Sequence, residues 1–289
     1  MLPPTSEPDE ALAALIVDRN VVLHEHEAPT YDLAHPELSH AFARWVTRRD
    51  LAMIRRAVEH VARPLALDVA AGTGRLALIL CRMGFDVIAV DNSPAMLAVL
   101  KLKYERMPEP KGTLEIVLSS ADDFSLHHIR DRALHLVTFG SALHHLPYYV
   151  RTLDRLASLV AEGGVVYVSH EPLPVQAERP TAEMRLVKYF DRFVLMLQRM
   201  RKAAVKMIRR RASRPATKPS AGGPSPDYYD GAGLDIQRIR AVLSRLGYAV
   251  LAERHYKDRK TALAAILDTF VFKTPNWLFN LVAQRRIDQ

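Results

Sequence analysis

The stretch Leu65-Ala-Leu-Asp-Val-Ala-Ala-Gly-Thr-Gly-Arg75 decides the fold of this 289-residue chain. Its apolar first half is typical of a buried strand, which ends near Asp68 and turns through glycines into a helix expected at residues 75–83. Gly72 and Gly74 remove side chains where the backbone must approach a ligand or adopt a positive φ. The following helix directs its free N–H groups at the same place, which suits phosphate or carboxylate. The stretch therefore predicts a nucleotide-cofactor turn.

A second expected strand, Asp86-Val-Ile-Ala-Val-Asp91, also ends in an acid. An acid at this place can accept hydrogen bonds from the ribose hydroxyls of an adenosine cofactor. The segment Gly72-Thr-Gly-Arg-Leu-Ala77 fits the loose form of the dinucleotide fingerprint, so an NAD(P)-dependent oxidoreductase stays open. Asp68 favours a different cofactor, because an ionised acid at the first strand end would repel a pyrophosphate but could accept from an ammonium group.

The order Asp-x-Ala-x-Gly-x-Gly at residues 68–74 resembles motif I of the class I S-adenosylmethionine-dependent methyltransferases. Three later segments agree with that family in order and spacing: Asp91-Asn-Ser-Pro-Ala-Met96, Ser120-Ala-Asp-Asp-Phe124 and Ser141-Ala-Leu-His-His-Leu-Pro147. They resemble its ribose-binding strand end, its adenine-binding turn and the segment after its fourth strand. The resemblance covers residues 30 to 170 and implies S-adenosyl-L-methionine as the cofactor.

The resemblance also implies roles for single residues. Asp68 would face the methionine ammonium, Asp91 would hold the ribose, and Met96 would pack on the adenine. Ala121 N–H and the Asp122 side chain would read the adenine edge. The other cofactor-binding residues that it implies are Tyr31, Ala70, Gly72, Gly74, Asn92, Ser120 and Ser141.

Two of these positions depart from the family pattern. Ser120 stands where many members carry an acid, so the adenine contact is expected to move to Asp122. Ala70 replaces a glycine that is more common at its position. Both departures affect single contacts and leave the expected site in place.

Strand and helix patterns alternate through the middle of the chain. Strands are expected near residues 65–70, 86–91, 113–118, 133–139 and 163–169, and helices near 75–83, 94–106 and 149–161. Such alternation predicts a parallel sheet that is covered on both faces. Residues 247–256 and 277–285 read as two more strands, which form an antiparallel pair in the family. We therefore expect an α/β, Rossmann-like, doubly wound and mostly parallel seven-stranded sheet with a terminal antiparallel strand pair.

The expected parts are an N-terminal helical cap at 1–62, a cofactor-binding core at 63–175, a basic helical insertion with a loop at 176–233, and the last helix with the terminal strand pair at 234–289. Within the cap, helices are expected at residues 9–19 and 37–61. His24 and His26 are expected on a loop, and no metal is expected there because no second ligand cluster matches them.

The basic charge is concentrated in residues 185–218, which hold 12 Lys and Arg against one acid, Asp191, for a net charge of +11. Apolar residues from Val187 to Met207 recur every three or four positions and predict a long helix with one apolar face. Residues 214–226 read as a loop. The helix could be a lid over the core, or it could meet an anionic membrane or a lipid-linked substrate. We argue against nucleic acid, because charge alone gives only sequence-independent affinity.

The expected chemistry is in-line attack by an acceptor on the sulfonium methyl group, for which the protein aligns the reactants and excludes water. His144 and His145 follow the fourth strand at the substrate edge of the sheet, so either could act as general base. The alternative is that one packs on the cofactor and the other caps a turn. His170 and Glu171 are expected to form a turn, and Tyr228 and Tyr229 to lie near the acceptor pocket.

Composition agrees with an enzyme of ordinary design, since 49% of the residues are hydrophobic and no apolar run is long enough to span a bilayer. The start lacks the order of a signal peptide, and the single cysteine, Cys81, is expected to be a buried thiol. We expect a cytoplasmic S-adenosylmethionine-dependent methyltransferase, peripheral to the membrane if the basic helix binds lipid. Its expected acceptor is an oxygen of a small molecule or a lipid-linked molecule. A non-catalytic protein with the same fold is the other alternative.

Overall fold

The computed structural model describes residues 7–35, 38, 41–129, 132–174, 186–187, 189–194, 196–197, 233–256, 261–267 and 278–287. The expected loop at 214–226, the tyrosines at 228 and 229, and the helix beyond residue 197 lie outside the described residues. Within the basic insertion, the described residues between 186 and 197 are helical, as the sequence predicts.

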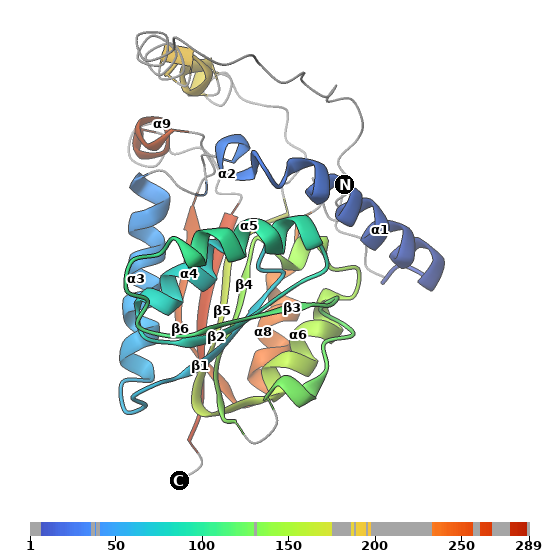
Figure 1. Ribbon diagram of the computed structural model, residues 1–289, viewed down its shortest axis with the longest axis vertical. Helices are drawn as coiled ribbons and strands as arrows, with labels where there is room; N and C mark the ends of the chain where they lie inside the picture. Colours follow the sequence, from blue (N-terminus) through green and yellow to red (C-terminus); the bar gives the residue numbers. More distant parts are fainter. Residues whose placement is uncertain are drawn as a thin grey trace.

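The centre of the molecule is one seven-stranded sheet in the order β3-β2-β1-β4-β5-β7-β6 (Figure 1). Its strands are β1 (Leu65–Val69), β2 (Asp86–Asp91), β3 (Leu114–Leu118), β4 (Leu134–Gly140), β5 (Val160–Pro172), β6 (Tyr248–Tyr256) and β7 (Leu278–Arg285). The pairs among β1 to β5 are parallel, whereas β7 is antiparallel to both of its neighbours, β5 and β6. The predicted fold class is therefore confirmed.

Helices cover both faces of this sheet. The described helices are α1 (Glu10–Glu27), α2 (Tyr31–Ala34), α3 (Ala41–Ala57), α4 (Arg75–Arg82), α5 (Pro94–Glu105), α6 (Tyr149–Ser158), α8 (Ile236–Arg245) and α9 (Ala262–Leu267), with short 3-10 turns η2 (Leu126–Ile129) and η3 (Leu143–His145). One core cluster packs α3, α4 and α5 against the sheet, and the other packs α6 and α8 against the opposite face. Cys81 is buried in the first of these clusters, as predicted.

The parallel strands bring the cofactor motifs together. Strand β1 is buried along its whole length and pairs with β2 on one side and β4 on the other. Because parallel strands share their carboxyl edge, the turns that follow β1, β2 and β4 open at the same edge of the sheet. Helix α1 and helix α2 lie beyond that edge (Figure 1).

Helix α1 is longer than the sequence predicts. The Asp9 side chain accepts a hydrogen bond from Leu12 N–H at 2.8 Å and caps its first turn. The helix was expected to end at residue 19 but continues to Glu27, so the loop expected around His24 and His26 is wrong. The extension contains no glycine or proline, and Asn20 within it donates to the carbonyl of His145 at 3.2 Å. This contact with the sheet edge supports a helical turn that periodicity alone does not show.

Helix α3 is held to the sheet by the buried Asp50. Its carboxylate accepts hydrogen bonds from Tyr167 Oη at 3.1 Å, Asn280 Nδ2 at 2.6 Å and Arg254 Nε at 2.7 Å. These partners come from β5, β7 and β6, so one fully buried acid fixes the helix over the sheet extension. The helix ends at Ala57, four residues before the predicted end.

Strand β5 is also longer than predicted and changes the expectation for His170 and Glu171. The predicted helix at 149–161 ends at Ser158, and the strand begins at Val160 and continues to Pro172. His170 and Glu171 are therefore strand residues and form no turn after it. His170 has a φ of +59°, and the pairing of β5 with β7 shifts register at this place. This local irregularity turns the Glu171 side chain toward the segment after β4.

Candidate cofactor site

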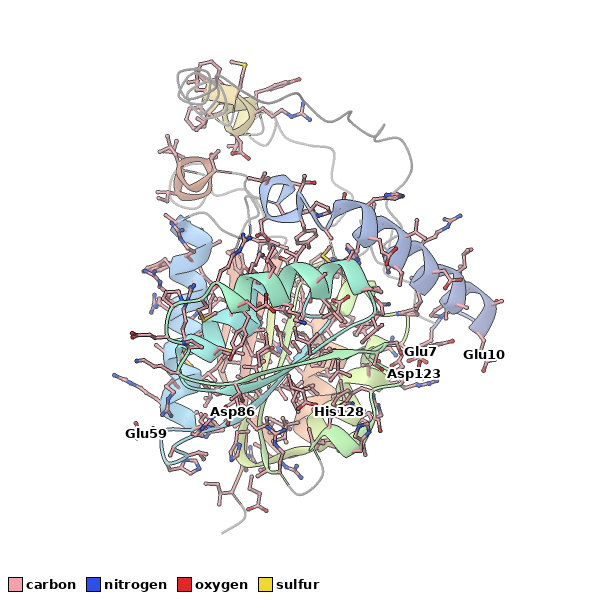
Figure 2. All side chains as sticks on the ribbon, in the orientation of Figure 1. Glu7, Glu10, Glu59, Asp86, Asp123 and His128 are labelled. Atoms are coloured by element: carbon pink, nitrogen blue, oxygen red, sulfur yellow. The ribbon has the colours of Figure 1, made fainter. Side chains whose placement is uncertain are left out.

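A cavity of about 400 Å³ lies at the carboxyl edge of the sheet, between the strand ends and the helices α1 and α2. Eleven of the residues expected at the site line it: Tyr31, Ala70, Gly72, Asp91, Asn92, Met96, Ser120, Ala121, Asp122, Ser141 and His145. Glu10 of α1 and Asp123 of the turn after β3 line it too, and Figure 2 shows them at the same side of the molecule. Four motifs that are distant in sequence thus share one hollow.

The glycine turn forms the floor of this cavity. Gly72 has a φ of +54°, and a Cβ atom added to it would meet nothing within 4 Å. Gly74, with a φ of +85°, is the N-cap of α4 and packs closely on Leu100, so it shapes the turn without lining the cavity. Ala70 has a φ of +50°, which is a strained conformation for a residue with a side chain. This explains why a glycine is more common at the position of Ala70.

Asp91 joins the end of β2 to the glycine turn. Its Oδ2 atom accepts from Gly72 N–H at 2.7 Å, and its Oδ1 atom accepts from Ser93 N–H at 2.8 Å. Burial raises the pKa of this carboxyl, while the two backbone donors lower it. Each carboxylate oxygen can still accept a second hydrogen bond, so the pair can also receive two hydroxyl groups from a ligand in the cavity.

Asp68 lies beneath the turn and is not one of the cavity-lining residues. Its Oδ2 atom accepts from Ala77 N–H at 2.9 Å, and its Oδ1 atom accepts from Thr138 Oγ1 at 2.6 Å. It therefore caps the first turn of α4 from the end of β1 and ties that helix to β4. These contacts give Asp68 a positioning role, and its expected contact with a methionine ammonium stays a prediction.

The residues expected to contact adenine lie in two places, the first turn of α5 and the turn after β3. Met96 is buried in the first turn of α5, where Ser93 accepts from its N–H at 3.3 Å. Asp122 accepts a hydrogen bond from Thr152 Oγ1 of α6, so one of its oxygens is already used. Ser120 Oγ donates to Asp123 Oδ2 at 2.8 Å and closes the same turn. Both groups face the cavity, and the adenine contacts themselves stay a prediction.

The Asp32 side chain attaches the cap to the glycine turn. It accepts from Thr73 Oγ1 at 2.7 Å and pairs with Lys103 Nζ at 2.6 Å, and Lys103 also donates to the Thr73 carbonyl at 3.0 Å. The preceding residue, Tyr31, contributes to the cavity wall. Of these two neighbouring residues, Tyr31 lies in the cavity wall, and Asp32 binds the cap to Thr73 and Lys103.

A row of imidazoles leads away from the cavity. His24 and His145 both line the cavity, and their rings meet edge to face with centroids 5.1 Å apart. The His144 ring lies 4.0 Å from the His145 ring, and its Nδ1 atom is 2.8 Å from Glu171 Oε2. Of the two histidines expected as general base, His145 reaches the cavity, whereas His144 lies behind it against the buried acid.

Glu171 is fully buried and holds the turn that carries both histidines. Its Oε1 atom accepts from the N–H groups of Ala142 and Leu143 at 2.6 Å and 3.0 Å, and its Oε2 atom accepts from His144 N–H at 3.2 Å. Backbone donors and one imidazole therefore surround the carboxylate. The sequence gives no local sign of this role, because the partners lie on another strand end.

Sequence reasoning also missed several residues of the cavity wall. Asn20 is 96% buried, and its Oδ1 atom has no hydrogen-bond partner among the described residues. Arg75 and Thr73 flank Gly74 and line the cavity as well. The apolar periodicity of residues 20–27 is weak, and only the packing of α1 on the sheet edge brings Asn20 into the wall. A buried acceptor that faces a cavity is suited to a donor group on a ligand.

We expect Gly72→Ala to weaken cofactor binding much more than it weakens the fold. The added methyl group meets no protein atom but extends into the space where a ligand would contact the turn. The positive φ costs about 1 kcal/mol of folding free energy, whereas affinity for S-adenosylhomocysteine should fall about tenfold, or about 1.4 kcal/mol. Urea unfolding and calorimetric titration measure the two effects, and equal affinity of both proteins would contradict the placement of the ligand.

We expect the wild type to become more stable than the variant Asp68→Asn as the pH is lowered. Burial raises the pKa of Asp68 to about 6, while Thr138 and Ala77 oppose this. Because the folded-state pKa lies above the unfolded value, this contribution is present in full at low pH and is lost as the pH rises through about 6. The difference in unfolding free energy, wild type minus variant, should therefore be about 1 kcal/mol larger at pH 5 than at pH 7. A constant difference in urea titrations at both pH values would contradict the prediction.

Residues 67–168 match the family model described as a methyltransferase domain. The demethylmenaquinone methyltransferase of Chlorobaculum parvum is 26% identical over 153 residues, which cover 53% of this chain and 59% of that protein. The ribosomal RNA small subunit methyltransferase J of Neisseria gonorrhoeae is 24% identical over 237 residues, which cover 78% and 83%. The chain thus spans less than two thirds of the length of the Chlorobaculum relative.

Two solved structures share the fold over most of their length. The magnesium protoporphyrin IX methyltransferase from Synechocystis, solved with bound S-adenosylhomocysteine, has a TM-score of 0.51 at 13% identity and covers 91% of this chain and 98% of its own. The N-methyltransferase NodS from Bradyrhizobium japonicum, also solved with S-adenosylhomocysteine, has a TM-score of 0.51 at 8% identity and covers 92% and 97%. The domain match and the four ordered motifs favour a methyltransferase over a nicotinamide-dependent oxidoreductase. Residues 67–168 therefore form a methyltransferase domain, in a chain that has the Rossmann-like fold of the class I S-adenosylmethionine-dependent methyltransferases.

Proposed function

We propose that this protein binds S-adenosylmethionine in the cavity at the sheet edge and transfers its methyl group to an oxygen atom of a small or lipid-linked acceptor. The observation that carries the proposal is that Gly72 of the first motif and Asp91 and Met96 of the second line one cavity of about 400 Å³. That volume lies in the usual range of small-molecule sites.

The residues of the cavity fit this cofactor. The space above Gly72 is open, which suits a ligand that touches the turn. Asp91 would hold the ribose hydroxyls, Met96 would pack on the adenine, and Ala121 with Asp122 would face the adenine edge. The bound cofactor supplies a methyl group on a sulfonium centre. The protein contributes alignment and a wall against water, and the cap helices α1 and α2 provide much of that wall.

The wall contributed by α1 supports an apolar acceptor. Ala13, Ala14 and Val17 of this helix line the cavity, together with Leu38 and Leu146. The same wall also carries many polar side chains, and its apolar part is suited to the hydrophobic body of an acceptor. Among the relatives, the names demethylmenaquinone methyltransferase and magnesium protoporphyrin IX methyltransferase both describe such molecules. The ribosomal RNA methyltransferase J does not, so the acceptor must be tested directly.

Within this wall, His145 is placed to take the proton of an acceptor hydroxyl. Its side chain lines the cavity, and its ring lies against the ring of His144. The His144 Nδ1 atom in turn lies 2.8 Å from Glu171 Oε2. A neutral imidazole at this place can act as general base, and the Glu171 carboxylate holds the neighbouring His144 ring in position. His24 supports the same ring from α1.

An acceptor screen tests the proposal. The protein is incubated with S-adenosylmethionine that carries a labelled methyl group and with one of three acceptors: a prenylated hydroxyquinol, a porphyrin carboxylic acid, or small ribosomal subunits. We expect label on oxygen in one of the two small-molecule samples. Label that appears only in RNA would overturn the acceptor class, and label at nitrogen or carbon would overturn oxygen transfer.

We expect His145→Ala to lower the rate of methyl transfer about 100-fold, with the affinity for S-adenosylhomocysteine within threefold of the wild type. The rise of the rate between acid and neutral pH should disappear with the imidazole. The control is His127→Ala, since His127 lies on η2 and does not line the cavity. If His145→Ala transfers methyl groups as fast as the control at every pH, alignment alone drives the reaction and the general-base assignment is wrong.

We also infer that the division of the chain follows the predicted parts. Residues 1–62 act as the cap and residues 63–175 form the cofactor-binding core. Residues 234–289 complete the sheet. The insertion at 176–233 then lies between the core and its last two strands. Support comes from the domain match at 67–168, which falls inside the proposed core.

A further inference from the structure

Large apolar side chains are exposed on four helical elements around the cap. They are Leu33 of α2, Trp45 of α3, Leu263 and Ile266 of α9, and Leu186, Tyr189, Phe193, Met196 and Leu197 of the helical residues of the insertion. These nine side chains, which we call the apolar surface, are between 44% and 74% exposed. Half of the large apolar side chains that are exposed among the described residues belong to this set. Single exposed apolar residues are normal, but such a concentration is typical of a docking surface.

The helical residues of the insertion show the strongest pattern. At 100° per residue, the five exposed apolar side chains of residues 186–197 fall within an arc of about 100°. The opposite side of this segment faces the protein: Val187 is fully buried, and Asp191 accepts from Thr261 Oγ1 at 2.7 Å just before α9. The segment is therefore anchored by one face while an apolar face points outward.

Basic side chains accompany the apolar surface. Arg192 is exposed within the insertion, and Arg44, Arg48 and Arg49 are exposed on α3. The Arg49 guanidinium lies 5.0 Å from the centre of the Trp45 ring. The sequence from 185 to 218 adds a net charge of +11 to the same part of the chain. An apolar face beside arginines is the combination that binds an anionic lipid interface.

The apolar surface also lies at the end of the molecule where the cavity is covered. Figure 1 shows α2, α9 and the helical part of the insertion beyond the carboxyl edge of the sheet, whereas the C-terminus lies at the opposite end. Leu33 is two residues from Tyr31, which lines the cavity. Among the described residues, no helix has both the length and the apolar content to cross a bilayer. Contact with lipid would therefore be made at the interface.

We propose that this end of the protein docks on an anionic membrane surface, with Tyr189, Phe193 and their apolar neighbours entering the boundary between headgroups and acyl chains. The arginines of α3 and the insertion pair with lipid phosphates. The proposal does not depend on methyl transfer, because binding to lipid needs neither cofactor nor acceptor. It adds a reason for the lipid-linked acceptor, since docking would present the cap and the cavity to the membrane.

Vesicle sedimentation of the full chain without cofactor tests this proposal. The vesicles contain phosphatidylcholine alone, or phosphatidylcholine with an equal amount of phosphatidylglycerol. We expect binding to the anionic vesicles only, and at least about tenfold weaker partitioning for the double variant Tyr189→Ser and Phe193→Ser. High salt should weaken binding by the wild type.

The matched control replaces two exposed apolar residues elsewhere, Val250→Ser in β6 and Ile287→Ser after β7, and should bind vesicles like the wild type. Urea unfolding of each variant reports the fold, and titration with S-adenosylhomocysteine tests the cofactor site separately. Equal partitioning of the double variant and the wild type would overturn the proposal, as would absence of binding to anionic vesicles. A wild-type dimer in ultracentrifugation that the double variant loses would instead assign the surface to contact between two copies of this chain.

Discussion

Asp91→Ala should weaken the binding of S-adenosylhomocysteine by at least about 100-fold, or about 2.7 kcal/mol. The carboxylate lines the cavity, and we propose that it accepts from two ribose hydroxyls; hydrogen bonds to a charged group are worth about 1.5 to 3 kcal/mol each. The same change removes the acceptor of Gly72 N–H, so the glycine turn also loses the contact that holds it to β2. Both effects act against the ligand.

Calorimetric titration measures this loss, with Asp123→Ala as the matched control. Asp123 is an exposed acid that lines the same cavity, but its hydrogen bonds are to Ser120 in its own turn. The control should bind within threefold of the wild type. If Asp91→Ala and Asp123→Ala bind equally well, general negative charge rather than a ribose contact explains the acid at the end of β2.

Glu171→Ala should lower the free energy of unfolding by about 3 to 5 kcal/mol. The wild-type carboxylate is fully buried and accepts from the N–H groups of Ala142, Leu143 and His144. Its removal leaves three donors without this acceptor in a region where two of those residues are themselves fully buried. An unsatisfied buried donor costs far more than a lost surface contact, so the turn after β4 should be strongly destabilised.

The control for this measurement is Asp154→Ala, which breaks the exposed pair between Asp154 and Arg245 at 2.7 Å. A pair of this kind contributes no more than about 1 kcal/mol. Urea unfolding compares the two variants at pH 7. Similar losses in both would show that the carboxylate of Glu171 is dispensable for the turn, and the account of how His144 and His145 are positioned would be wrong.

Local signals in the sequence were sufficient for the central part of the fold. The apolar runs of β1 and β2 identify buried parallel strands, and each has an acid, Asp68 or Asp91, at or next to its last residue, which marks the sheet edge. The glycines after β1 show where the backbone leaves the strand. Because each of these features depends only on neighbouring residues, the bounds of these two strands and eleven of the cavity-lining residues could be predicted.

The parts that were missed depend on contacts between distant segments. Asn20 enters the site only because α1 continues past residue 19 and packs on the turn of His145, 125 positions later. Glu171 looks like a turn residue until the partners at Ala142 and Leu143 are known. Asp68 was placed correctly at the strand end, but its side chain caps α4 beneath the cavity. The composition of a short segment does not contain this information.

The central claim is that the cavity holds S-adenosylmethionine, and calorimetric titration of the wild type with S-adenosylhomocysteine tests it most directly, with NAD and NADP titrated in parallel. We predict one site per chain with a dissociation constant on the order of micromolar for S-adenosylhomocysteine and no heat from either nicotinamide nucleotide. Binding of NAD or NADP with no binding of S-adenosylhomocysteine would contradict the account, because Gly72, Asp91 and Met96 would then belong to a dinucleotide site.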